Sequence, residues 1–564
     1  SEAQTCTKCT PCREGVPQMT ALLEKITKCE GSEEDLAELK RIATIVKDSA
    51  DCAIGYEAAR MTLKGVRGFR DDFEEHIKTN RCLIKTKESV PCQTLCPAHV
   101  NVPGYISLIH DGRYEEAVQL IRLDNPFPST CGLICEHPCE VHCRRTMVDD
   151  PINIRGLKAF AVEHEGTPPM PEMAEPTGKK VAVIGGGPGG LSAAFYLSIM
   201  GHEVTVYEQR KRLGGMLRYG IPSYRLPREV LDGEIAALQR SGFRTVTDIS
   251  VGKDITLEEL KAQFDAVFIA IGAHTDRKIG IEGEDAKGVI SAVEMLRAIG
   301  DEEMPDYTGQ DIVVVGGGNV AMDVARSAIR LGAASVKIAY RRRRADMTAL
   351  PEEVEGAVAE GCEVLELHAP VRIEKNEDGS VKGLIVKPQI AGPIKGGRPA
   401  PVDSSEEEFL LPCDKVLVAV GQGIDSSVFE EFGIPVKRGA IGALNTGSVK
   451  DFDGVFSGGD CVTGPATVIR AIAGGKVAAA NIDEYLGFNH EIINHIELPV
   501  ARFDDRVPMG RINMKELPAE ERKKSFIHIE CGLTEEEALC EASRCLRCDH
   551  FGYGIFKGGR REKW

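Results

Sequence analysis

Cysteines are concentrated at the two ends of this 564-residue chain. Of nineteen cysteines, twelve lie in residues 1–143 and four in 531–548, which leaves three in the long middle. They form tight runs: C-x2-C-x2-C at 6–12, C-x3-C-x3-C at 135–143 and C-x2-C at 545–548. Closely spaced thiolates bind iron–sulfur clusters, which take four cysteine ligands each and carry single electrons. The spacing therefore indicates several electron-transfer centres.

The composition argues against other classes of protein. The net charge of −17, from 69 basic and 86 acidic residues, gives no reason to expect nucleic acid or an anionic membrane as a partner. No apolar run approaches the roughly 18 residues of a membrane-spanning helix, so we expect no membrane. We also expect no signal peptide. Many close-spaced cysteines without an export signal favour a reducing compartment, so the expected location is cytoplasmic.

The pattern of apolar residues and glycines changes along the chain. Helical periodicity among cysteines gives way, after a proline-rich boundary, to short β-rich runs that alternate with glycines and helices. This pattern predicts an α/β fold: two Rossmann-like dinucleotide-binding domains, preceded by two helical iron–sulfur segments and followed by a cysteine-bearing tail. The expected bounds are 1–78 and 79–177 for the helical segments, 178–288 with 420–495 for the first dinucleotide domain, 289–419 for the second, and 496–564 for the tail.

A glycine fingerprint follows the first β-rich run. Gly185, Gly187 and Gly190 lie between the strand KKVAVIG and the helix LSAAFYLSIM, so the turn is tight and the helix amides face a pyrophosphate. Glu208 ends the next strand, 23 residues after Gly185, where a carboxylate hydrogen-bonds a ribose. This unit is predicted to bind the ADP half of FAD or NAD.

A second fingerprint has a different selectivity. Gly316, Gly318 and Ala321 follow DIVVVG, but the next strand ends in four arginines, 341–344, instead of an acid. Guanidinium groups match a 2′-phosphate, which an acid would repel, so this site is predicted to bind NADP(H). Arg341 and Arg342 lie nearest the strand end and are the preferred contacts, whereas one or two of the four are expected to form a solvated face.

A third glycine-rich turn, GVFSGGDCVTGPATVIRAIAGG, places flavin at the first site. In two-dinucleotide flavoproteins such a turn reaches the pyrophosphate and ribityl chain through Asp460. A helix starting near Pro465 and Ala466 is expected to direct its N-terminus at the isoalloxazine. The first site is therefore assigned to FAD and the second to the pyridine nucleotide, in two folds of interrupted connectivity.

About two-thirds of the chain, from Cys92 to Glu484, resembles the small subunit of glutamate synthase and its relatives, among them the NADP(H)-binding flavoprotein of electron-bifurcating transhydrogenases. The resemblance rests on CPAHVNVPGYI, GLICEHPCEVHC, LGGMLRYGIPSYRLP, GGGNVAMD, YRRRR and SGGDCVTGPATVIRAI. By position it implies that Cys96, Cys135 and Cys139 bind one 4Fe–4S cluster, and that Cys92 with Cys143 binds another.

The same resemblance implies further contacts with the nucleotides. The predicted flavin wall consists of Leu217, Tyr219, Gly220 and Pro222. The remaining predicted contacts are Gly215, Gly459, Asp460 and Ala466 for FAD, and Asn319 and Asp323 for NADP(H).

The sequence departs from the family at one cluster. Relatives carry R-C-L-x-C just before the position of Cys92, whereas RCLIKTKESVPC here keeps only Cys82. The missing string occurs near the end of the chain as RCLRCDH. Cys545 and Cys548 are therefore expected to fold back and complete the cluster begun by Cys92 and Cys143.

Two points about ligands stay open at this stage. The alternative to folding back is a separate tail cluster of Cys531, Cys540, Cys545 and Cys548. The fourth ligand beside Cys96, Cys135 and Cys139 is either Cys131, which is near in sequence, or a residue other than cysteine.

The first 78 residues resemble a different family, the cluster domain of the NADH-binding flavoprotein subunit of complex I and of bifurcating hydrogenases. TCTKCTPCREG matches its signature, and Cys52 lies 40 residues after Cys12, where that family supplies the fourth ligand. Cys6, Cys9, Cys12 and Cys52 are thus predicted to bind a 4Fe–4S cluster, with zinc as the alternative.

Together these features predict an NADP-dependent iron–sulfur flavoprotein oxidoreductase with FAD, NADP(H) and three 4Fe–4S clusters, or four if the tail forms its own. FAD converts between hydride and single electrons, so no catalytic triad is needed. The fusion of modules predicts the NADP(H) subunit of an electron-bifurcating transhydrogenase, with ferredoxin and an NADH/FMN-binding iron–sulfur subunit as partners. The alternatives are a glutamate synthase small subunit, an NADPH-linked subunit of a hydrogenase or formate dehydrogenase, and an electron conduit with vestigial nucleotide sites.

Overall fold

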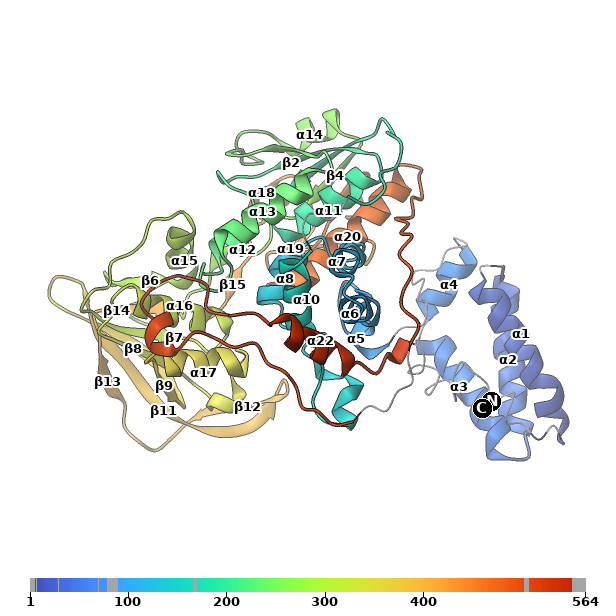
Figure 1. Cartoon of the computed structure of the whole chain (residues 1–564), viewed down its shortest axis with the longest axis horizontal. Helices are drawn as coiled ribbons and strands as arrows, with labels where there is room; N and C mark the ends of the chain where they lie inside the picture. The colour runs from blue at the N-terminus through green and yellow to red at the C-terminus, as the bar shows by residue number, and fades with distance from the viewer. Residues whose placement is uncertain are drawn as a thin grey trace. The chain divides into compact units, whose positions relative to one another are not determined.

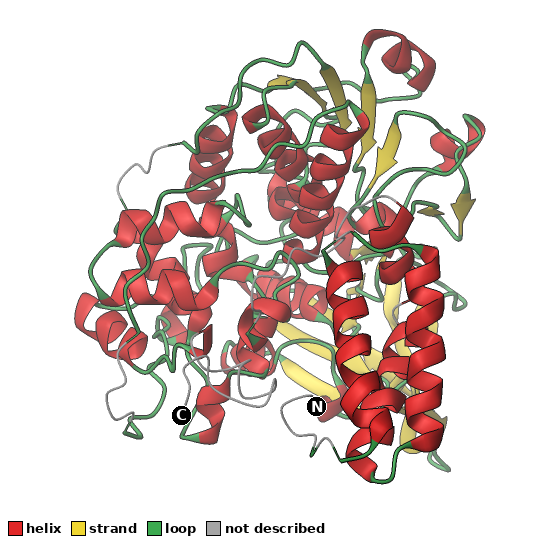
Figure 2. Cartoon of the chain, turned by 90° about the vertical axis from the view of Figure 1, so that its right-hand side faces the viewer, coloured by secondary structure: helices red, strands yellow, loops and turns green. Residues whose placement is uncertain are grey.

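The computed structural model describes residues 6, 8–28, 30–68, 70–78, 90–165, 170–501 and 507–549. Cys82 lies outside these residues. The chain divides into two compact units, Ser1–Ser89 and Val90–Trp564. The described part of the first unit is helical, and the strands belong to the second (Figure 1; Figure 2). Among the described residues, none of the helices combines the length and apolar character needed to cross a membrane.

Amphipathic helices build the first unit. A capping box starts α2, because Ser32 Oγ accepts a hydrogen bond from Asp35 N–H and the Asp35 carboxylate accepts one from Ser32 N–H at 2.8 Å. Buried apolar residues at three- and four-residue spacing then form its inner face: Leu36, Leu39, Ile42, Ala43 and Val46. The helices are α1 (Val16–Thr27), α2 (Glu33–Ser49), α3 (Ala53–Gly68) and α4 (Arg70–Lys78), preceded by a π-helical turn, Pro11–Gly15.

The second unit begins with a helical segment that carries cysteines. Its helices are α5 (Pro91–Thr94), α6 (Val102–His110), α7 (Tyr114–Arg122), α8 (Pro128–Ile134), α9 (Pro138–Val141) and α10 (Ile154–Glu163), with a 3-10 turn at Arg144–Met147. Their apolar faces join one continuous core with the first dinucleotide domain. This shared core fixes the cluster segment against the flavin domain.

The first dinucleotide domain is a parallel sheet of order β18-β4-β1-β2-β3. Its strands are β1 (Lys180–Ile184), β2 (Glu203–Tyr207), β3 (Arg244–Val246), β4 (Ala266–Ile269) and β18 (Val455–Ser457). Its helices are α11 (Pro188–Ile199), α12 (Met216–Tyr219), α13 (Arg228–Gln239), α14 (Leu257–Gln263), α18 (Ser427–Glu431), α19 (Asp460–Thr463) and α20 (Val468–Tyr485). Since β18 enters only after the second domain, the connectivity is interrupted, as predicted.

The second dinucleotide domain repeats the parallel arrangement, with order β6-β14-β7-β8-β9. Its strands are β6 (Val289–Ser291), β7 (Asp311–Val315), β8 (Ser335–Tyr340), β9 (Glu363–Glu366) and β14 (Lys415–Val418). Its helices are α15 (Ala292–Gly300), α16 (Asn319–Arg330) and α17 (Pro351–Ala359), with a 3-10 turn at Arg344–Asp346. Two short antiparallel ladders complete the pair of domains: β5 (Thr275–Asp276) with β15 (Gln422–Gly423), and β16 (Val436–Lys437) with β17 (Ala440–Ile441).

An antiparallel layer that the sequence interpretation did not include is inserted in the second domain. It contains β10 (His368–Lys375), β11 (Val381–Lys395), β12 (Arg398–Asp403) and β13 (Phe409–Pro412). One face of β11 packs Leu384 and Val386 against β14 and its neighbours. Its far end is exposed, so the strand lacks the continuous apolar run that marks a buried parallel strand.

The C-terminal segment acts as a strap across the second unit, and we call its described residues 507–549 the strap. It contains α21 (Ala519–Arg522) and α22 (Glu535–Ser543). Phe526 packs on the core of the second dinucleotide domain, and α22 packs on α6 and α10. Figure 1 shows this red segment running from the NADP-binding domain to the cluster segment. The strap therefore contacts both the second dinucleotide domain and the helical segment that carries cysteines.

Candidate nucleotide and cluster sites

The turn between β1 and α11 has the geometry of a dinucleotide site. Gly185 has φ of +111°, and a Cβ there would lie 2.4 Å from the Ala270 carbonyl oxygen. A Cβ at Gly190 would lie 1.9 Å from the Gly185 oxygen, so both positions require glycine. At Gly187 the nearest atom would be 3.8 Å away, on Gly215, which leaves room for a ligand beside the helix N-terminus.

Glu208 fastens this turn to the end of β2. Its carboxylate oxygens accept hydrogen bonds from Gly186 N–H at 2.8 Å and from Arg210 N–H at 2.9 Å. Burial raises the pKa of this carboxyl, although those bonds oppose the shift. The same side chain lines a cavity with Gly185, Gly187, Gly215, Tyr219, Gly459 and Asp460. The predicted FAD residues from three parts of the chain therefore meet in one cavity.

Asp460 provides the strongest sign that a ligand fits there. Its Oδ1 is buried and, within the described chain, has no hydrogen-bond partner. Burial raises the pKa of Asp460 to about 6, opposed by the backbone N–H of Ala466. Because buried polar atoms are normally paired, this oxygen fits a donor group of a bound flavin nucleotide. The buried, unpaired oxygen of Asp460 is therefore compatible with FAD bound in this cavity.

The structure adds two details to the flavin prediction. The helix expected near Pro465 and Ala466 begins at Val468, because Gly464, with φ of +83°, separates it from the short helix α19. Leu217 is fully buried, and Met216 and Tyr219 line the cavity, so a direct flavin contact of Leu217 stays a prediction. The contacts predicted for Gly220, Pro222 and Ala466 stay predictions.

Replacing Asp460 with alanine is expected to weaken FAD binding about tenfold to a hundredfold, because a hydrogen bond to a charged group contributes about 1.5–3 kcal/mol. The measurement is the dissociation constant of FAD from the deflavinated full chain. Glu258→Ala, which removes an exposed acid on α14, is the control and should retain full affinity. Equal affinities in the two variants would contradict the assignment.

The second fingerprint has the same backbone geometry. Gly316 has φ of +149°, and a Cβ there would lie 2.3 Å from the Ala419 oxygen, whereas a Cβ at Gly318 would have Thr348 Oγ1 as its nearest atom, at 3.4 Å. Ala321 is fully buried. Asn319, at the start of α16, accepts a hydrogen bond from Leu350 N–H at 2.9 Å and donates to Glu136 at 2.7 Å. The second nucleotide site thus touches the residue next to Cys135.

Asp323 is placed differently from the expectation that it holds NADP(H). It is buried, and its carboxylate accepts from Arg225 Nη1 at 2.9 and 3.0 Å and from the Tyr224 hydroxyl at 3.4 Å. Burial raises its pKa to about 6, with Arg225 opposing the shift. Asp323 therefore joins the flavin domain to α16, and a direct nucleotide contact stays a prediction.

The four arginines after β8 divide into different environments. Arg341 is exposed, and no side-chain hydrogen bond of its guanidinium is seen in the described chain. Arg342 donates to the Pro399 oxygen at 2.9 Å, and Arg343 pairs with Asp346 at 2.7 Å. Because Arg342 uses its Nε for Pro399, Arg341 is the first of the two preferred candidates to test as the 2′-phosphate contact.

Arg341→Ala is expected to raise the KM for NADPH about tenfold and leave the KM for NADH unchanged, because only the former carries the 2′-phosphate. Steady-state reduction of an artificial one-electron acceptor measures both constants. Arg343→Ala removes an equally exposed arginine that is already paired, and serves as the control. A parallel loss with both nucleotides would place Arg341 outside the phosphate site.

Four cysteines meet in the first unit. Cys9 and Cys12 lie at the π-helical turn, and Cys52 directly precedes α3. Burial and a hydrogen bond with Cys9 raise the pKa of Cys12 to about 11, and Cys52 and Cys6 add to the shift through their charges. A Cβ at Gly55 would lie 2.4 Å from Cys12 Sγ, so glycine leaves room for the sulfur. The thiols form a donor set that fits a cluster.

Two further groups of cysteines lie in the second unit. Burial raises the pKa of Cys92 well above its usual value, and the charges of Cys545, Cys139, Cys143 and Cys548 contribute. Burial also raises the pKa of Cys545 to about 12, with Cys548 and Cys143 contributing. The other group consists of Cys96, Cys131, Cys135 and Cys139, all buried. The tail cysteines therefore lie beside Cys92 and Cys143.

The alternative tail cluster has less support in the geometry. Cys531 is exposed, and its backbone N–H bonds to the Lys515 oxygen at 2.8 Å. Neither Cys531 nor Cys540 is among the main charges acting on Cys545 and Cys548. The placement favours folding back, and the ligand roles stay predictions.

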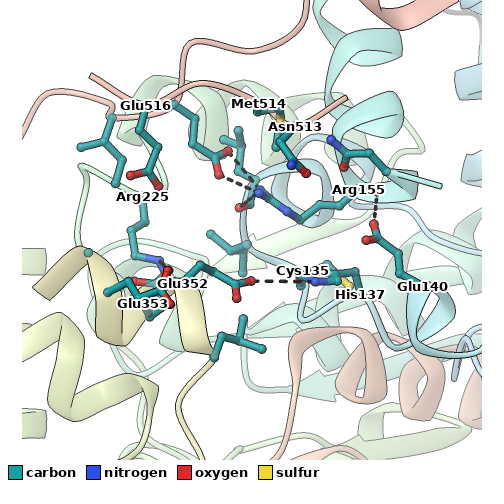
Figure 3. Close-up of a pocket in the computed structure, with 18 of the residues that line it drawn as sticks. Cys135, His137, Glu140, Arg155, Arg225, Glu352, Glu353, Asn513, Met514 and Glu516 are labelled. Carbon is teal, nitrogen blue, oxygen red and sulfur yellow. Dashed lines mark hydrogen bonds and ion pairs between the residues drawn. The ribbon is translucent and has the colours of Figure 1, made fainter. Parts of the chain in front are cut away.

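A cavity of about 860 Å³ lies between the cysteine-bearing helices of residues 91–163, the second dinucleotide domain and the strap. Figure 3 shows Cys135 and His137 on one side and Arg225 and Glu353 on the other. Its charged walls pair with one another: Arg155 with Glu530 at 2.7 Å, and Arg511 with Glu140 at 2.6 Å. Since these arginines are already compensated, we assign no anionic ligand to this cavity.

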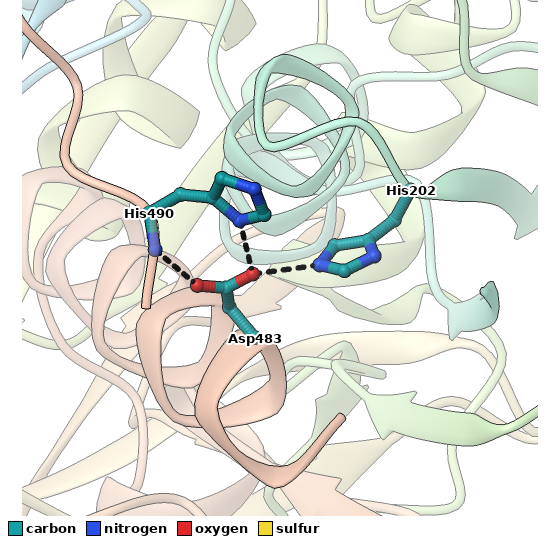
Figure 4. A group of neighbouring side chains, drawn as sticks. All are labelled: His202, Asp483 and His490. Carbon is teal, nitrogen blue, oxygen red and sulfur yellow. Dashed lines mark hydrogen bonds and ion pairs between the residues drawn. The ribbon is translucent and has the colours of Figure 1, made fainter. Parts of the chain in front are cut away.

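His202, Asp483 and His490 form another cluster of metal-ligating side chains (Figure 4). Asp483 Oδ1 accepts from His202 Nε2 at 2.9 Å and from His490 Nδ1 at 2.7 Å, while the Thr177 hydroxyl lies 2.7 Å from His202 Nδ1. The imidazole nitrogens that face Asp483 are therefore used in hydrogen bonds to its carboxylate, and a cation would have to replace those protons. This cluster ties the segment after α20 to the start of β2.

Comparison with known proteins agrees with this geometry. Residues 179–475 match the family model described as pyridine nucleotide-disulphide oxidoreductase. Residues 1–76 match the NADH-ubiquinone oxidoreductase-F iron-sulfur binding region, and residues 63–168 match dihydropyrimidine dehydrogenase domain II, 4Fe-4S cluster. The fold and sites thus define an NADP-dependent iron–sulfur flavoprotein oxidoreductase. The chain belongs to the pyridine nucleotide-disulphide oxidoreductase family.

Three curated relatives bear on this assignment. NADP(+)-dependent formate dehydrogenase subunit beta of Moorella thermoacetica is 36% identical, over 99% of this chain and 90% of that protein. NADPH-Fe(3+) oxidoreductase subunit beta of Geobacter sulfurreducens is 36% identical, over 96% and 88%. Glutamate synthase [NADPH] small chain of Escherichia coli is 32% identical, over 70% and 88%. The predicted cofactors, FAD, NADP(H) and 4Fe–4S clusters, are confirmed; the number of clusters stays a prediction.

Sequence interpretation missed residues whose role depends on tertiary contacts. Lys158 is buried among four cysteines, and Arg225 and Glu234 connect the flavin domain to its neighbours. Lys158 offers the only sequence signal of the three, because it interrupts the apolar run of IRGLKAFAVE.

Proposed function

We propose that this chain is the NADP(H)-linked electron-transfer subunit of a multi-subunit oxidoreductase. The observation that carries the proposal is the contact between Asn319 of the NADP fingerprint and Glu136, the neighbour of Cys135, at 2.7 Å. It places the nucleotide domain directly against a predicted cluster site in one compact unit. Electrons would enter or leave as NADPH at one end and reach a partner subunit through cysteine-bound clusters at the other.

The chemistry divides between the bound groups and the chain. When bound, FAD would supply the exchange between the hydride of NADP(H) and the single electrons of iron–sulfur clusters. The protein holds the reactants: Glu208 fixes the glycine turn, Asp460 presents an unpaired oxygen, and the ion pair of Arg225 with Asp323 joins the two nucleotide domains. Positioning of this kind is the protein's main contribution to hydride transfer.

The identity of the partner is the finer part of the proposal. Two relatives that match nearly the whole chain are named as beta subunits, one of an NADP-dependent formate dehydrogenase and the other of an NADPH-Fe(3+) oxidoreductase. A formate dehydrogenase-type catalytic subunit is therefore the first partner to test. The match of residues 1–76 to an NADH-ubiquinone oxidoreductase-F region supports a second candidate, an electron-bifurcating transhydrogenase with an NADH/FMN-binding subunit and ferredoxin.

The test is anaerobic isolation of the native complex through a tag on this chain. NADPH should bleach the flavin absorbance and then reduce the clusters. Formate-dependent reduction of NADP would support the first partner, and NAD reduction that requires ferredoxin would support bifurcation. A flavin that NADPH does not bleach would contradict the proposal as a whole.

The variant Cys9→Ser distinguishes flavin reduction by NADPH in the second unit from electron transfer through the predicted cluster of the first unit. The variant should retain NADPH-dependent flavin bleaching, because Cys9 lies outside the unit that holds both nucleotide sites. It should lose electron transfer to the partner if the first unit makes that connection. Unchanged transfer would assign the exit to the second unit.

A further inference from the structure

Four buried thiols and one buried ammonium share a site in the cluster segment. Cys96, Cys131, Cys135 and Cys139 are each at most 9% exposed, and Lys158 of α10 is 6% exposed. Lys158 is among the main charges acting on each of the four cysteines. The four cysteines are in turn the main charges acting on Lys158. The arrangement provides a complete set of sulfur donors with a cation beside it.

Local packing fixes Cys131 in this group. A Cβ at Gly132 would lie 2.9 Å from Ala159 Cα, so α8 and α10 approach closely at the residues next to Cys131 and Lys158. The Cys131 thiol donates a hydrogen bond to Asn125 Oδ1 at 3.9 Å, and Cys135 directly follows the end of the same helix. Cys131 is thus beside an expected ligand and not isolated in an apolar core.

Both ends of α8 are anchored. The carboxylate of Glu234, from the flavin domain, accepts from Ser129 N–H at 2.6 Å and from Thr130 N–H at 2.9 Å at the start of the helix. At its end, Arg155 Nη1 donates to the Leu133 oxygen at 2.8 Å. The short helix is therefore held in place at both ends, with Cys131 within it and Cys135 directly after it.

The positive charge of the buried Lys158 side chain requires a negative charge nearby. A buried ammonium is costly unless an opposite charge lies nearby. Neutral thiols do not supply that charge, whereas thiolates bound to an iron–sulfur cluster give the site a net negative charge that grows by one unit on one-electron reduction. An ammonium beside the cluster stabilises the reduced form more than the oxidised form.

We propose that Cys131 is the fourth ligand of the cluster bound by Cys96, Cys135 and Cys139, and that Lys158 is its buried counter-ion and raises its reduction potential. The inference rests on the proposed function, because it assumes that the other three cysteines hold a cluster. The electron comes from NADPH through the bound flavin, and no proton is taken up at the sulfurs.

The ligand assignment is tested on the anaerobically purified full chain. Cys131→Ser should lower the iron and sulfide content by one cluster, or convert it to a three-iron form with its own electron paramagnetic resonance signal. Cys362→Ser, which changes a buried thiol in the NADP-binding domain, is the matched control and should retain all iron. A Cys131→Ser chain with full iron and an unaltered spectrum would overturn the assignment.

Cys135→Ser distinguishes failure of this inference from failure of the proposed function. If Cys135→Ser loses a cluster and Cys131→Ser does not, the cluster exists and its fourth ligand is another residue. If neither variant loses iron, the segment holds no such cluster and the proposed electron path fails with it.

The role of Lys158 is tested by a potential, which a purely structural residue would not shift. Lys158→Met should make the reduction equilibrium of this cluster at least tenfold less favourable, a shift of 59 mV for a one-electron couple. Lys158→Arg keeps the charge and should retain a potential close to that of the unaltered protein. If Lys158→Met fails to bind the cluster, iron retained in Lys158→Arg supports the charge requirement, and loss in both overturns it. An unaltered potential in Lys158→Met also overturns it.

Discussion

Replacing Cys548 with serine is expected to remove one 4Fe–4S cluster from the chain, about four iron atoms, and to alter the environment of Cys92. The reason is the proximity of the tail cysteines to Cys92 and Cys143, which together supply the four thiolates that such a cluster takes. Iron and sulfide analysis of the anaerobic protein, with its electron paramagnetic resonance spectrum, measures the loss.

The strap positions these two cysteines through buried hydrogen bonds. The Glu541 carboxylate accepts from Asn153 N–H at 2.7 Å and from Arg544 Nη1 at 2.6 Å. The Arg544 carbonyl accepts from Arg145 Nη1 at 3.1 Å. The residue before Cys545 is thus fixed to the segment that follows Cys143, which holds the two parts of the predicted cluster site together.

Cys531→Ser is the control that separates the two arrangements of the tail. Cys531 is exposed, so the variant should keep all its iron if the tail folds back. If a separate tail cluster existed, Cys531→Ser and Cys548→Ser would lose the same cluster, and Cys92→Ser would leave it intact. That result would contradict the fold-back arrangement.

Local sequence was sufficient to predict the nucleotide domains, because glycine turns are determined by backbone geometry. Gly185 and Gly316 both adopt positive φ beneath a carbonyl oxygen, and no other residue type fits there. The tail's place beside Cys92 was also predictable, since a string missing at one end of the chain was present at the other.

Features that depend on long-range contacts could not be predicted in the same way. The ion pair of Asp323 with Arg225 could not be predicted, because its partner comes from the other domain, 98 residues away. The start of α20 depends on Gly464, whose positive φ ends the preceding short helix. The burial of Lys158 becomes apparent only once α8 packs on α10.

Glu360→Ala is expected to lower the apparent melting temperature of the second dinucleotide domain by about 10 °C, because breaking a buried ion pair costs about 3–5 kcal/mol. The Glu360 carboxylate is buried and accepts hydrogen bonds from three arginines: Arg326 at 2.7 Å, Arg330 at 2.5 Å and Arg522 at 2.8 Å. Arg522 belongs to the strap, so loss of its ion pair with Glu360 should also expose residues 507–533 to limited proteolysis. Calorimetry and timed proteolysis measure the two effects.

The pH dependence of Glu360→Gln separates the charge from the shape of this side chain. Burial opposes ionisation, but hydrogen bonds from Arg330 and Arg326 outweigh it and lower the pKa of Glu360 to about 2. Since an unfolded glutamate has a pKa of about 4.3, the stabilisation is fully present above about pH 5 and is lost as the pH falls toward 2. The stability deficit of Glu360→Gln should therefore shrink over that range. Glu355→Gln changes an exposed acid on α17, the helix that Glu360 directly follows, and should match the unaltered protein throughout. A deficit that is constant with pH would show that shape, and not charge, makes Glu360 necessary.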